Sequence, residues 1–236
     1  MDSPGFDILY EQGPCLVVMK PGGVLTQAPP GIDSLEVRIK RLLKARNGTA
    51  DPVYLGVPHR LDRPVSGAMV FGLNVRATRR LAEQFERRSV QKTYWAVVQG
   101  AVEPEHATWT DFVRKVYGKP QAETVEEGHP EGRIAILHYR VLRRQTAWSL
   151  LEIELETGRT HQIRVQAASR GFPILGDQLY GSQQPFGPQT VDERLRWIAL
   201  HGRCLTFRHP LTREDVSTTA PLSEPWQAFT GVGPAE

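Results

Sequence analysis

Several features that carry structure or chemistry in other proteins are scarce in this 236-residue chain. Cysteine occurs only as Cys15 and Cys204, far apart and outside any Cys-x-x-Cys or Cys/His spacing. This scarcity argues against a disulfide framework and a structural zinc site, and a reducing compartment, the cytoplasm, fits best. No apolar run nears the roughly 18 residues of a membrane span, and the acidic N-terminus lacks the pattern of a signal peptide. We expect a chain that is neither exported nor embedded in a membrane.

Motifs for cofactors are missing as well. The sequence contains no Gly-x-Gly-x-x-Gly fingerprint, no Walker lysine loop and no His-Glu-x-x-His. The sequence therefore gives no support for a nucleotide-cofactor enzyme or a metalloprotease. We expect no cofactor and no metal, and we find neither internal repeats nor low-complexity blocks.

The composition is that of an ordinary globular protein, with 40% hydrophobic and 23% charged residues. The formal net charge of +3 permits a polyanionic partner, but a surplus this small does not by itself predict one. The length fits a single domain over residues 1–236. The placement of the basic residues is thus more informative than their sum.

Two amphipathic helices are expected in the first ninety residues. Asp33 and Glu36 make a capping-box-like start for the first helix, and Asn74 is a cap for the second. The first helix should stop at Asn47-Gly48. The apolar stripes that we expect to be buried are Leu35, Ile39, Leu42 and Leu43, then Val75, Thr78, Leu81, Ala82 and Phe85. Arginine and lysine occupy the opposite faces, which on their own are more often merely solvated.

Strands are expected where β-branched, aromatic or other apolar residues alternate or run together. These segments are residues 16–19, 68–71, 92–100, 133–143 and 148–156. In the third of them Tyr94, Ala96 and Val98 share one face. Residues 118–132 read as a polar loop.

One carboxylate stands out in the segment His59-Arg60-Leu61-Asp62-Arg63-Pro64-Val65-Ser66-Gly67. Pro64 favours extended geometry at Arg63, and Ser66-Gly67 is expected to supply a turn. Asp62 would then lie on a shaped loop that runs into a buried strand, a suitable place for a nucleophile. An aspartate in a Pro/Gly loop more often bonds its own backbone, and these residues alone favour that interpretation.

A basic cluster occupies Thr157-Gly158-Arg159-Thr160-His161-Gln162-Ile163-Arg164, at an expected strand-to-helix turn capped by Thr160. His161 and Arg164 are three residues apart and share a helix face. A cation in the first helical turn opposes the helix dipole, so Arg164 calls for a compensating anion. That anion could be a phosphate group of a polyanionic partner or Asp62.

Together these motifs resemble the RluA family of RNA pseudouridine synthases. HRLDRPVSG is similar to the family's HRLDxxTSG, with Val65 in place of Thr, and TGRTHQIRVQ is similar to TGRxHQIRxH, with Gln166 in place of His. KTYWAVVQG is similar to KxYxAxVxG, and Lys20-Pro21-Gly22 follows Met19 where the family commonly has Asn. The resemblance runs from about Val17 to Trp226 and includes the closing segments around Asp177, Tyr180 and His201, where Gly202 replaces a common Ala.

The resemblance implies an α/β fold in the broad sense, of the α+β type, with a central mixed, mostly antiparallel sheet flanked by helices. It implies Asp62 as the catalytic residue, Arg164 as its ion-pair partner and Tyr94 against the target base. The side chains expected to bind RNA are those of Arg60, Lys92, Arg159 and His161.

The implied activity is isomerisation of specific uridines in structured RNA, ribosomal or transfer, to pseudouridine. Uracil is detached from C1', turned and rejoined through carbon, so no redox equivalent or phosphate donor is consumed. Whether Asp62 attacks C1', attacks C6 or removes a proton from C2' stays open. Family members often carry an N-terminal S4-type domain, and because the first motif begins near residue 17 we expect none here, but a single catalytic domain that is monomeric.

Two other classes of function remain open from the sequence. A non-catalytic RNA-binding module would keep the basic surface without needing Asp62, Tyr94 and Arg164 together. A carboxylate-dependent nucleoside or glycoside hydrolase would use Asp62 but normally requires a second placed carboxylate, which these motifs do not offer.

Overall fold

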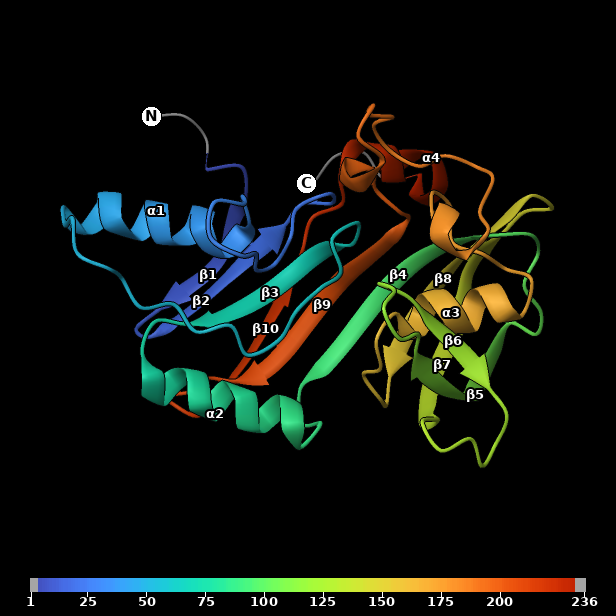
Figure 1. Cartoon of the computed structure of the whole chain (residues 1–236), viewed down its shortest axis with the longest axis horizontal. Helices are drawn as coiled ribbons and strands as arrows, with labels where there is room; N and C mark the ends of the chain where they lie inside the picture. Colours follow the sequence, from blue (N-terminus) through green and yellow to red (C-terminus); the bar gives the residue numbers. More distant parts are fainter. Residues whose placement is uncertain (1–3, 232–236) are drawn as a thin grey trace. The chain divides into compact units, whose positions relative to one another are not determined.

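The computed structural model describes residues 4–231 and divides the chain into two compact units (Figure 1). Unit 1 is formed by Met1–Gln91 and Gly202–Pro221, and unit 2 by Lys92–His201 and Leu222–Glu236. Each unit thus joins segments that are distant in sequence. No helix within residues 4–231 has the length and apolar character needed to cross a membrane.

Unit 1 is built on strands in the order β1, β2, β3 and β9, with β10 paired to β9. The β1–β2, β2–β3 and β9–β10 pairs are antiparallel. The strands are β1 (Asp7–Gln12), β2 (Cys15–Lys20), β3 (Ser66–Gly72), β9 (Leu200–Arg208), which enters this unit at Gly202, and β10 (Asp215–Thr219). Every residue of β2 and β3 is buried. Strands buried on both faces read as continuous apolar runs, which is why residues 16–19 and 68–71 were recognisable in the sequence.

Helix α1 (Leu35–Asn47) confirms the first expected helix but begins at a different cap. The Ser34 side chain accepts a hydrogen bond from the Val37 amide, whereas Asp33 pairs with Arg38 at 2.6 Å. Gly48 ends the helix in the left-handed conformation, with φ of 60°. Three positions of the expected stripe, Leu35, Ile39 and Leu43, are buried.

Helix α2 (Val75–Glu86) starts at the expected cap, because the Asn74 side chain accepts a hydrogen bond from the Ala77 amide at 2.8 Å. Its buried face is centred on Ala77 and Leu81. Val75 was expected in the core but is 68% exposed, since the helix is rotated toward Ala77.

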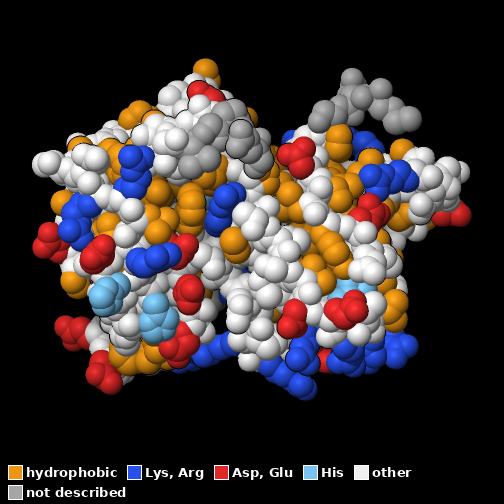
Figure 2. Space-filling view, turned by 180° about the vertical axis from the view of Figure 1, so that it is seen from behind, with side chains coloured by type: hydrophobic (Ala, Val, Ile, Leu, Met, Phe, Trp, Pro, Cys, Tyr) orange, Lys and Arg blue, Asp and Glu red, His pale blue; other side chains and the backbone are white. Residues whose placement is uncertain are grey.

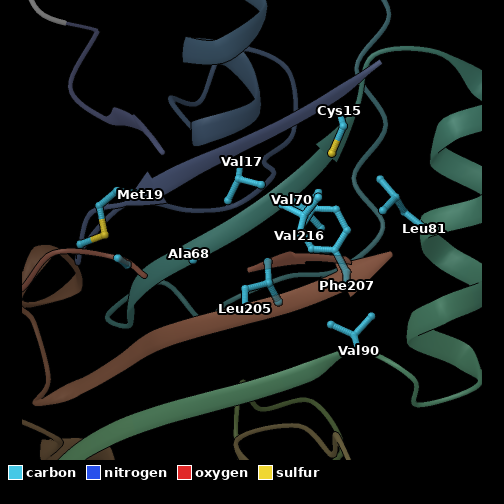
Figure 3. Close-up of a cluster of buried hydrophobic side chains, with 11 residues drawn as sticks. Cys15, Val17, Met19, Ala68, Val70, Leu81, Val90, Leu205, Phe207 and Val216 are labelled. Atoms are coloured by element: carbon cyan, nitrogen blue, oxygen red, sulfur yellow. The ribbon is translucent and has the colours of Figure 1, made fainter. Parts of the chain in front are cut away.

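The core of unit 1 lies between these strands and α2 (Figure 3). This cluster combines Leu81 of α2 with apolar side chains from four strands, among them Val17, Val70 and Phe207. Each such fully buried side chain contributes about 1.5 to 3 kcal/mol relative to exposure. Cys15 belongs to this cluster and behaves as a small hydrophobic residue; burial raises the pKa of its thiol to about 12.

Unit 2 is antiparallel, with strands in the order β4, β8, β7, β5 and β6. The strands are β4 (Gln91–Gln99), β5 (His106–Lys115), β6 (Ala122–Val125), β7 (Arg133–Arg144) and β8 (Trp148–Leu155), and the helices are α3 (Gln162–Ser169) and α4 (Gln227–Thr230). The three strands expected here are confirmed. Strand β6 was missed inside the expected loop, because four residues with two polar side chains give no periodic signal and the pairing with β5 creates the strand.

A close approach fixes the start of β3. Gly67 has φ of 136°, and a Cβ there would lie 2.4 Å from the backbone nitrogen of Gly202. Gly67 also pairs with Lys20 of β2. Sheet pairing on one side and the close backbone of Gly202 on the other leave no room for a side chain.

We predict that Gly67→Ala lowers the free energy of unfolding by more than the roughly 1 to 2 kcal/mol of a left-handed alanine alone, because strand β9 must also shift. Gly118→Ala is the control, since Gly118 also has positive φ (69°) but nothing within 4 Å of the added Cβ. Urea unfolding measures both variants. An equal decrease in the free energy of unfolding of the two variants would show that the close backbone of Gly202 adds nothing to the cost of the Gly67→Ala substitution.

Candidate active site

Asp62 lies on the loop that leads into β3, and its side chain is half-buried. Its carbonyl accepts a hydrogen bond from the Val65 amide at 3.1 Å, which closes a turn over Arg63 and Pro64. The turn therefore precedes the expected position, because Ser66 and Gly67 already belong to β3. Strand pairing has overridden the local turn preference of Ser-Gly.

Both neighbours of Asp62 are anchored to the loop that follows β2. The Thr26 hydroxyl donates to the carbonyl of Leu61 at 2.9 Å and accepts from the Leu61 amide at 3.3 Å. The carbonyl of Arg63 accepts from the Lys20 ammonium at 3.1 Å, and Arg63 Nε donates to the Gly23 carbonyl at 3.1 Å. The backbone that carries the carboxylate is thus fixed on both sides.

Lys20 is completely buried and donates three hydrogen bonds, to the carbonyls of Pro21 (2.9 Å), Val24 (2.6 Å) and Arg63 (3.1 Å). Three acceptors match the three donors of an ammonium group. Burial lowers the pKa of Lys20 to about 7, and the negative charge of Asp62 acts in the opposite direction. In the sequence, Lys20 was noted only as part of the Lys20-Pro21-Gly22 motif and was not assigned to the site. A lysine directly after an apolar strand was the available signal.

His59 links the Asp62 loop to helix α2. Its Nε2 accepts a hydrogen bond from the Val70 amide at 3.0 Å, and its ring stacks on Phe85 with centroids 4.3 Å apart. Arg60, the next residue, is exposed, as an RNA contact requires.

In unit 2, Arg164 is buried in α3 and forms a two-pronged ion pair with Asp177. Nε lies 2.6 Å from Oδ2 and Nη2 lies 2.8 Å from Oδ1, and the Asp177 side chain is 1% exposed. The Asp177 carboxylate is therefore an anion that compensates the charge of Arg164 within the same unit. The sequence did not identify it as the partner of Arg164. The pairing of Arg164 with Asp62, which belongs to unit 1, stays a prediction.

Tyr180 contacts both His161 and Arg164, although His161 lies in front of helix α3 and not on the expected shared helix face. The Arg164 guanidinium lies 4.9 Å from the centre of the Tyr180 ring, and the Tyr180 hydroxyl is 2.8 Å from His161 Nδ1. The same hydroxyl accepts from the Ala122 amide at 2.9 Å, which connects α3 to strand β6. The planar guanidinium group of Arg164 is attracted to the face of the Tyr180 ring and also bonded to Asp177. Together these two contacts fix the orientation of the Arg164 side chain.

The expected cap at Thr160 is wrong. Helix α3 begins at Gln162, and His161 precedes it with φ of 53° and no side-chain cap. The Gln162 side chain closes the turn instead, accepting from the Arg159 amide (2.9 Å) and the Thr157 hydroxyl (2.8 Å). A glutamine inside the first turn thus replaces the usual hydroxyl in front of it.

The remaining expected site residues in unit 2 lie on its strands or at the α3 turn. Arg159 Nε donates to the carbonyl of Ile134 at 2.8 Å, and Lys92 and Tyr94 are half-buried in β4. Gln166, where the family commonly has His, is fully buried and donates to Asp111 at 2.6 Å. Within the described residues its Oε1 has no hydrogen-bond partner.

We predict that wild-type protein gains stability relative to Lys20→Met as pH rises from 7 toward 10.5. A lysine whose pKa is lowered from 10.5 to about 7 binds fewer protons in the folded than in the unfolded state over that window. Stability then increases with pH, by up to about 1.4 kcal/mol per unit. Urea unfolding at several pH values measures the difference, with Lys44→Met as the control for losing a lysine elsewhere in unit 1. A difference independent of pH would contradict the lowered pKa.

We predict that Asp177→Asn costs about 3 to 5 kcal/mol of stability, because the buried Arg164 loses its counter-charge. The control is Glu131→Gln, which breaks a surface pair with Arg114 at a carboxylate side chain that is 67% exposed. Such exposed pairs contribute about 0 to 1 kcal/mol. Thermal or urea unfolding measures the stability of both variants. Similar small decreases in stability would mean that the buried ion pair stabilises the protein no more than the surface pair does.

Comparisons with known proteins show the family to which the chain is similar. Residues 14–169 match the family model described as RNA pseudouridylate synthase. The chain is 37% identical over 227 residues to the ribosomal large subunit pseudouridine synthase D of Xanthomonas campestris pv. campestris, covering 94% of this chain and 67% of that protein. It is 35% identical over 224 residues to the uncharacterized RNA pseudouridine synthase YlyB of Bacillus subtilis (92% and 69% covered). For the uncharacterized RNA pseudouridine synthase slr1629 of Synechocystis the identity is 34% over 221 residues, with 92% of this chain and 65% of that protein covered.

Solved structures show the same fold. The human RNA pseudouridylate synthase domain containing 4 superposes with a TM-score of 0.74 at 24% identity, over 92% of this chain and 89% of that one. For the human RNA pseudouridylate synthase domain containing 1 the TM-score is 0.70, also at 24% identity, over 98% and 89%. The expected α+β class with mostly antiparallel strands is thereby confirmed. The chain spans 65% to 69% of the length of the three curated relatives above. The motifs, the matched residues 14–169 and these relatives establish that this chain belongs to the RNA pseudouridylate synthase family.

Proposed function

We propose that this chain is an RNA pseudouridine synthase in which Asp62 is the catalytic carboxylate. Family membership supports the reaction class. The observation that carries the residue assignment is the anchoring of the Asp62 loop, where Thr26 and Lys20 fix the residues on either side of the aspartate. A half-buried carboxylate on a fixed backbone suits an attack that needs accurate orientation.

The reaction breaks the bond between N1 of uracil and C1' of ribose and forms a bond between C5 and C1'. The proton at C5 is lost and N1 gains one, so the net change is an isomerisation. Asp62 acts in this proposal as nucleophile at C1' or C6, or as base at C2'. Tyr94 contacts the detached uracil and serves in removal of the C5 proton, and Arg164 pairs with the Asp62 carboxylate.

The role proposed for Arg164 is supported by its immediate surroundings in unit 2. Asp177 and Tyr180 fix the plane of the guanidinium, so its orientation does not depend on substrate. A guanidinium that keeps its orientation can pair with a second carboxylate without losing side-chain entropy. Arg164 is therefore a pre-oriented partner for the catalytic aspartate in this proposal.

The proposed partner is structured RNA, bound by the phosphate-directed side chains of Arg60, Lys92, Arg159 and His161. Relatives named ribosomal large subunit pseudouridine synthase D make ribosomal RNA the first substrate to test, with transfer RNA second. We propose a monomer that acts in the cytoplasm, in keeping with two cysteines that are both free thiols. The target uridine must leave its base stack to enter the site, which costs about a few kcal/mol of unstacking free energy.

A hydrolase is the less favoured alternative. The structure offers Asp177 as a further carboxylate in the motif region, but it is buried and already neutralised by Arg164. It therefore does not supply the second acid or base that glycoside hydrolysis requires.

We predict that Asp62→Asn abolishes tritium release from ribosomal RNA labelled at uridine C5, while RNA binding and folding persist. The amide keeps size and hydrogen bonding but lacks the negative charge. Asp51→Asn, on an exposed loop of unit 1, makes the same charge change and should leave turnover unaltered. Near-normal tritium release by Asp62→Asn would remove Asp62 from the mechanism. Free uracil without tritium release from wild type would indicate a hydrolase, and binding alone would indicate an RNA-binding module.

A further inference from the structure

One face of unit 1 concentrates arginine from two elements. Arg76, Arg79 and Arg80 project from α2, and Arg208 and Arg213 come from the end of β9 and the turn before β10. We call these five residues the α2 arginine surface. Figure 2 shows blue side chains gathered along the lower right edge, on the side where α2 lies.

Hydrogen bonds connect helix α2 to the end of β9 and to the turn between β9 and β10. The Gln84 side chain donates to the carbonyl of Arg208 at 2.9 Å and accepts from its amide at 2.8 Å, and Arg80 donates to the carbonyl of Pro210 at 2.6 Å. Inside the turn His209 Nδ1 accepts from the amides of Leu211 (3.2 Å) and Thr212 (3.0 Å). The backbone that carries the surface is therefore fixed before any partner binds.

The charges on this surface are crowded and weakly compensated. Desolvation and then the nearby charges of Arg76, Arg213 and Arg79 lower the pKa of Arg80 below its ordinary value. The carboxylates close by are loosely placed and exposed, with Arg79 3.7 Å from Glu83 and Arg208 3.5 Å from Asp215. By contrast, Arg46 of α1 lies 2.9 Å from Glu11. Gathered guanidinium groups without close counter-charges are suited to an external polyanion.

The surface is also connected to the Asp62 loop through contacts within unit 1. His59, three residues before Asp62, stacks on Phe85 of α2. Helix α2 rests directly on the end of β3, because a Cβ at Gly72 would lie 2.7 Å from the Thr78 amide nitrogen. An anion bound along α2 would thus have a fixed position relative to Asp62.

We propose that the α2 arginine surface binds the phosphodiester backbone of the substrate RNA outside the target nucleotide. The inference rests on the proposed function and adds a second contact region to it. Arginine clusters provide sequence-independent affinity by neutralising phosphates and releasing counterions. The surface sets affinity and placement, while the uridine is selected elsewhere.

The test compares two double variants with equal loss of charge. Arg76→Gln with Arg79→Gln removes two exposed arginines and spares Arg80, whose bond to Pro210 is structural. Arg41→Gln with Arg46→Gln removes two arginines from α1 of the same unit. Fluorescence anisotropy with a labelled ribosomal RNA transcript gives affinity over a potassium chloride series, and thermal unfolding confirms that both variants are folded.

The α2 variant should bind more weakly to RNA of any sequence. Its slope of log affinity against log salt should shrink by about 0.7 to 0.9 for each phosphate that is no longer neutralised, or about 1.4 to 1.8 in all. The α1 variant should retain the wild-type slope. Tritium release at saturating RNA should stay at the wild-type rate in the α1 variant, because Arg41 and Arg46 belong neither to the proposed site nor to the α2 arginine surface.

An unchanged slope in the α2 variant, or an equal decrease in both variants, overturns the inference. In the first case the surface would be merely solvated or would serve an acidic protein, and in the second only net charge would matter. Wild-type tritium release is measured alongside, so that failure of the proposed function is seen separately. If wild type binds RNA through α2 but releases no tritium, the surface remains an RNA contact and the synthase assignment fails.

Discussion

The ammonium group of Lys20 connects two loops of unit 1, and the position of Asp62 depends on that connection. A buried charge is costly unless oxygen atoms replace its water, and three backbone carbonyls do so here. One of them, that of Arg63, is adjacent to Asp62. Because Lys20 ends β2 and Gly67 lies opposite it in β3, the same residue also relates the loop to the sheet. Removing the cation would leave carbonyls unsatisfied and the loop without its inner support.

In unit 2 a buried positive charge is stabilised by the carboxylate of a side chain instead of by backbone carbonyls. Arg164 is buried against Asp177, and Tyr180 covers the guanidinium. A planar, two-pronged pair fixes direction as well as charge, which a lysine could not do. Within residues 4–231, each unit thus contains a buried lysine or arginine whose acceptors are fixed by the fold. In both cases the cation belongs to a motif that the sequence displays.

The sequence predicted features whose cause is local. Asn74 and Gly48 were recognisable because capping depends on a single residue type at a chain position. The choice of Ser34 over Asp33 and the exposure of Val75 depend on how each helix meets the sheet, which no local pattern contains. Strand β6 exists only through its pairing with β5, and Asp177 meets Arg164 only through the fold. The candidate site was therefore predictable as a set of motif residues, whereas the contacts that hold those residues were not.

The interleaved order of the two units has a consequence for synthesis of the chain. Strand β3 neighbours β9, and roughly 130 residues separate Gly72 from Gly202, so a ribosome needs on the order of ten seconds to supply the second strand after the first. During that interval one edge of β3 is open, and the residues of unit 2 emerge before unit 1 can close. The edge of β3, the strand into which the Asp62 loop runs, is thus covered late, only after strand β9 has left the ribosome.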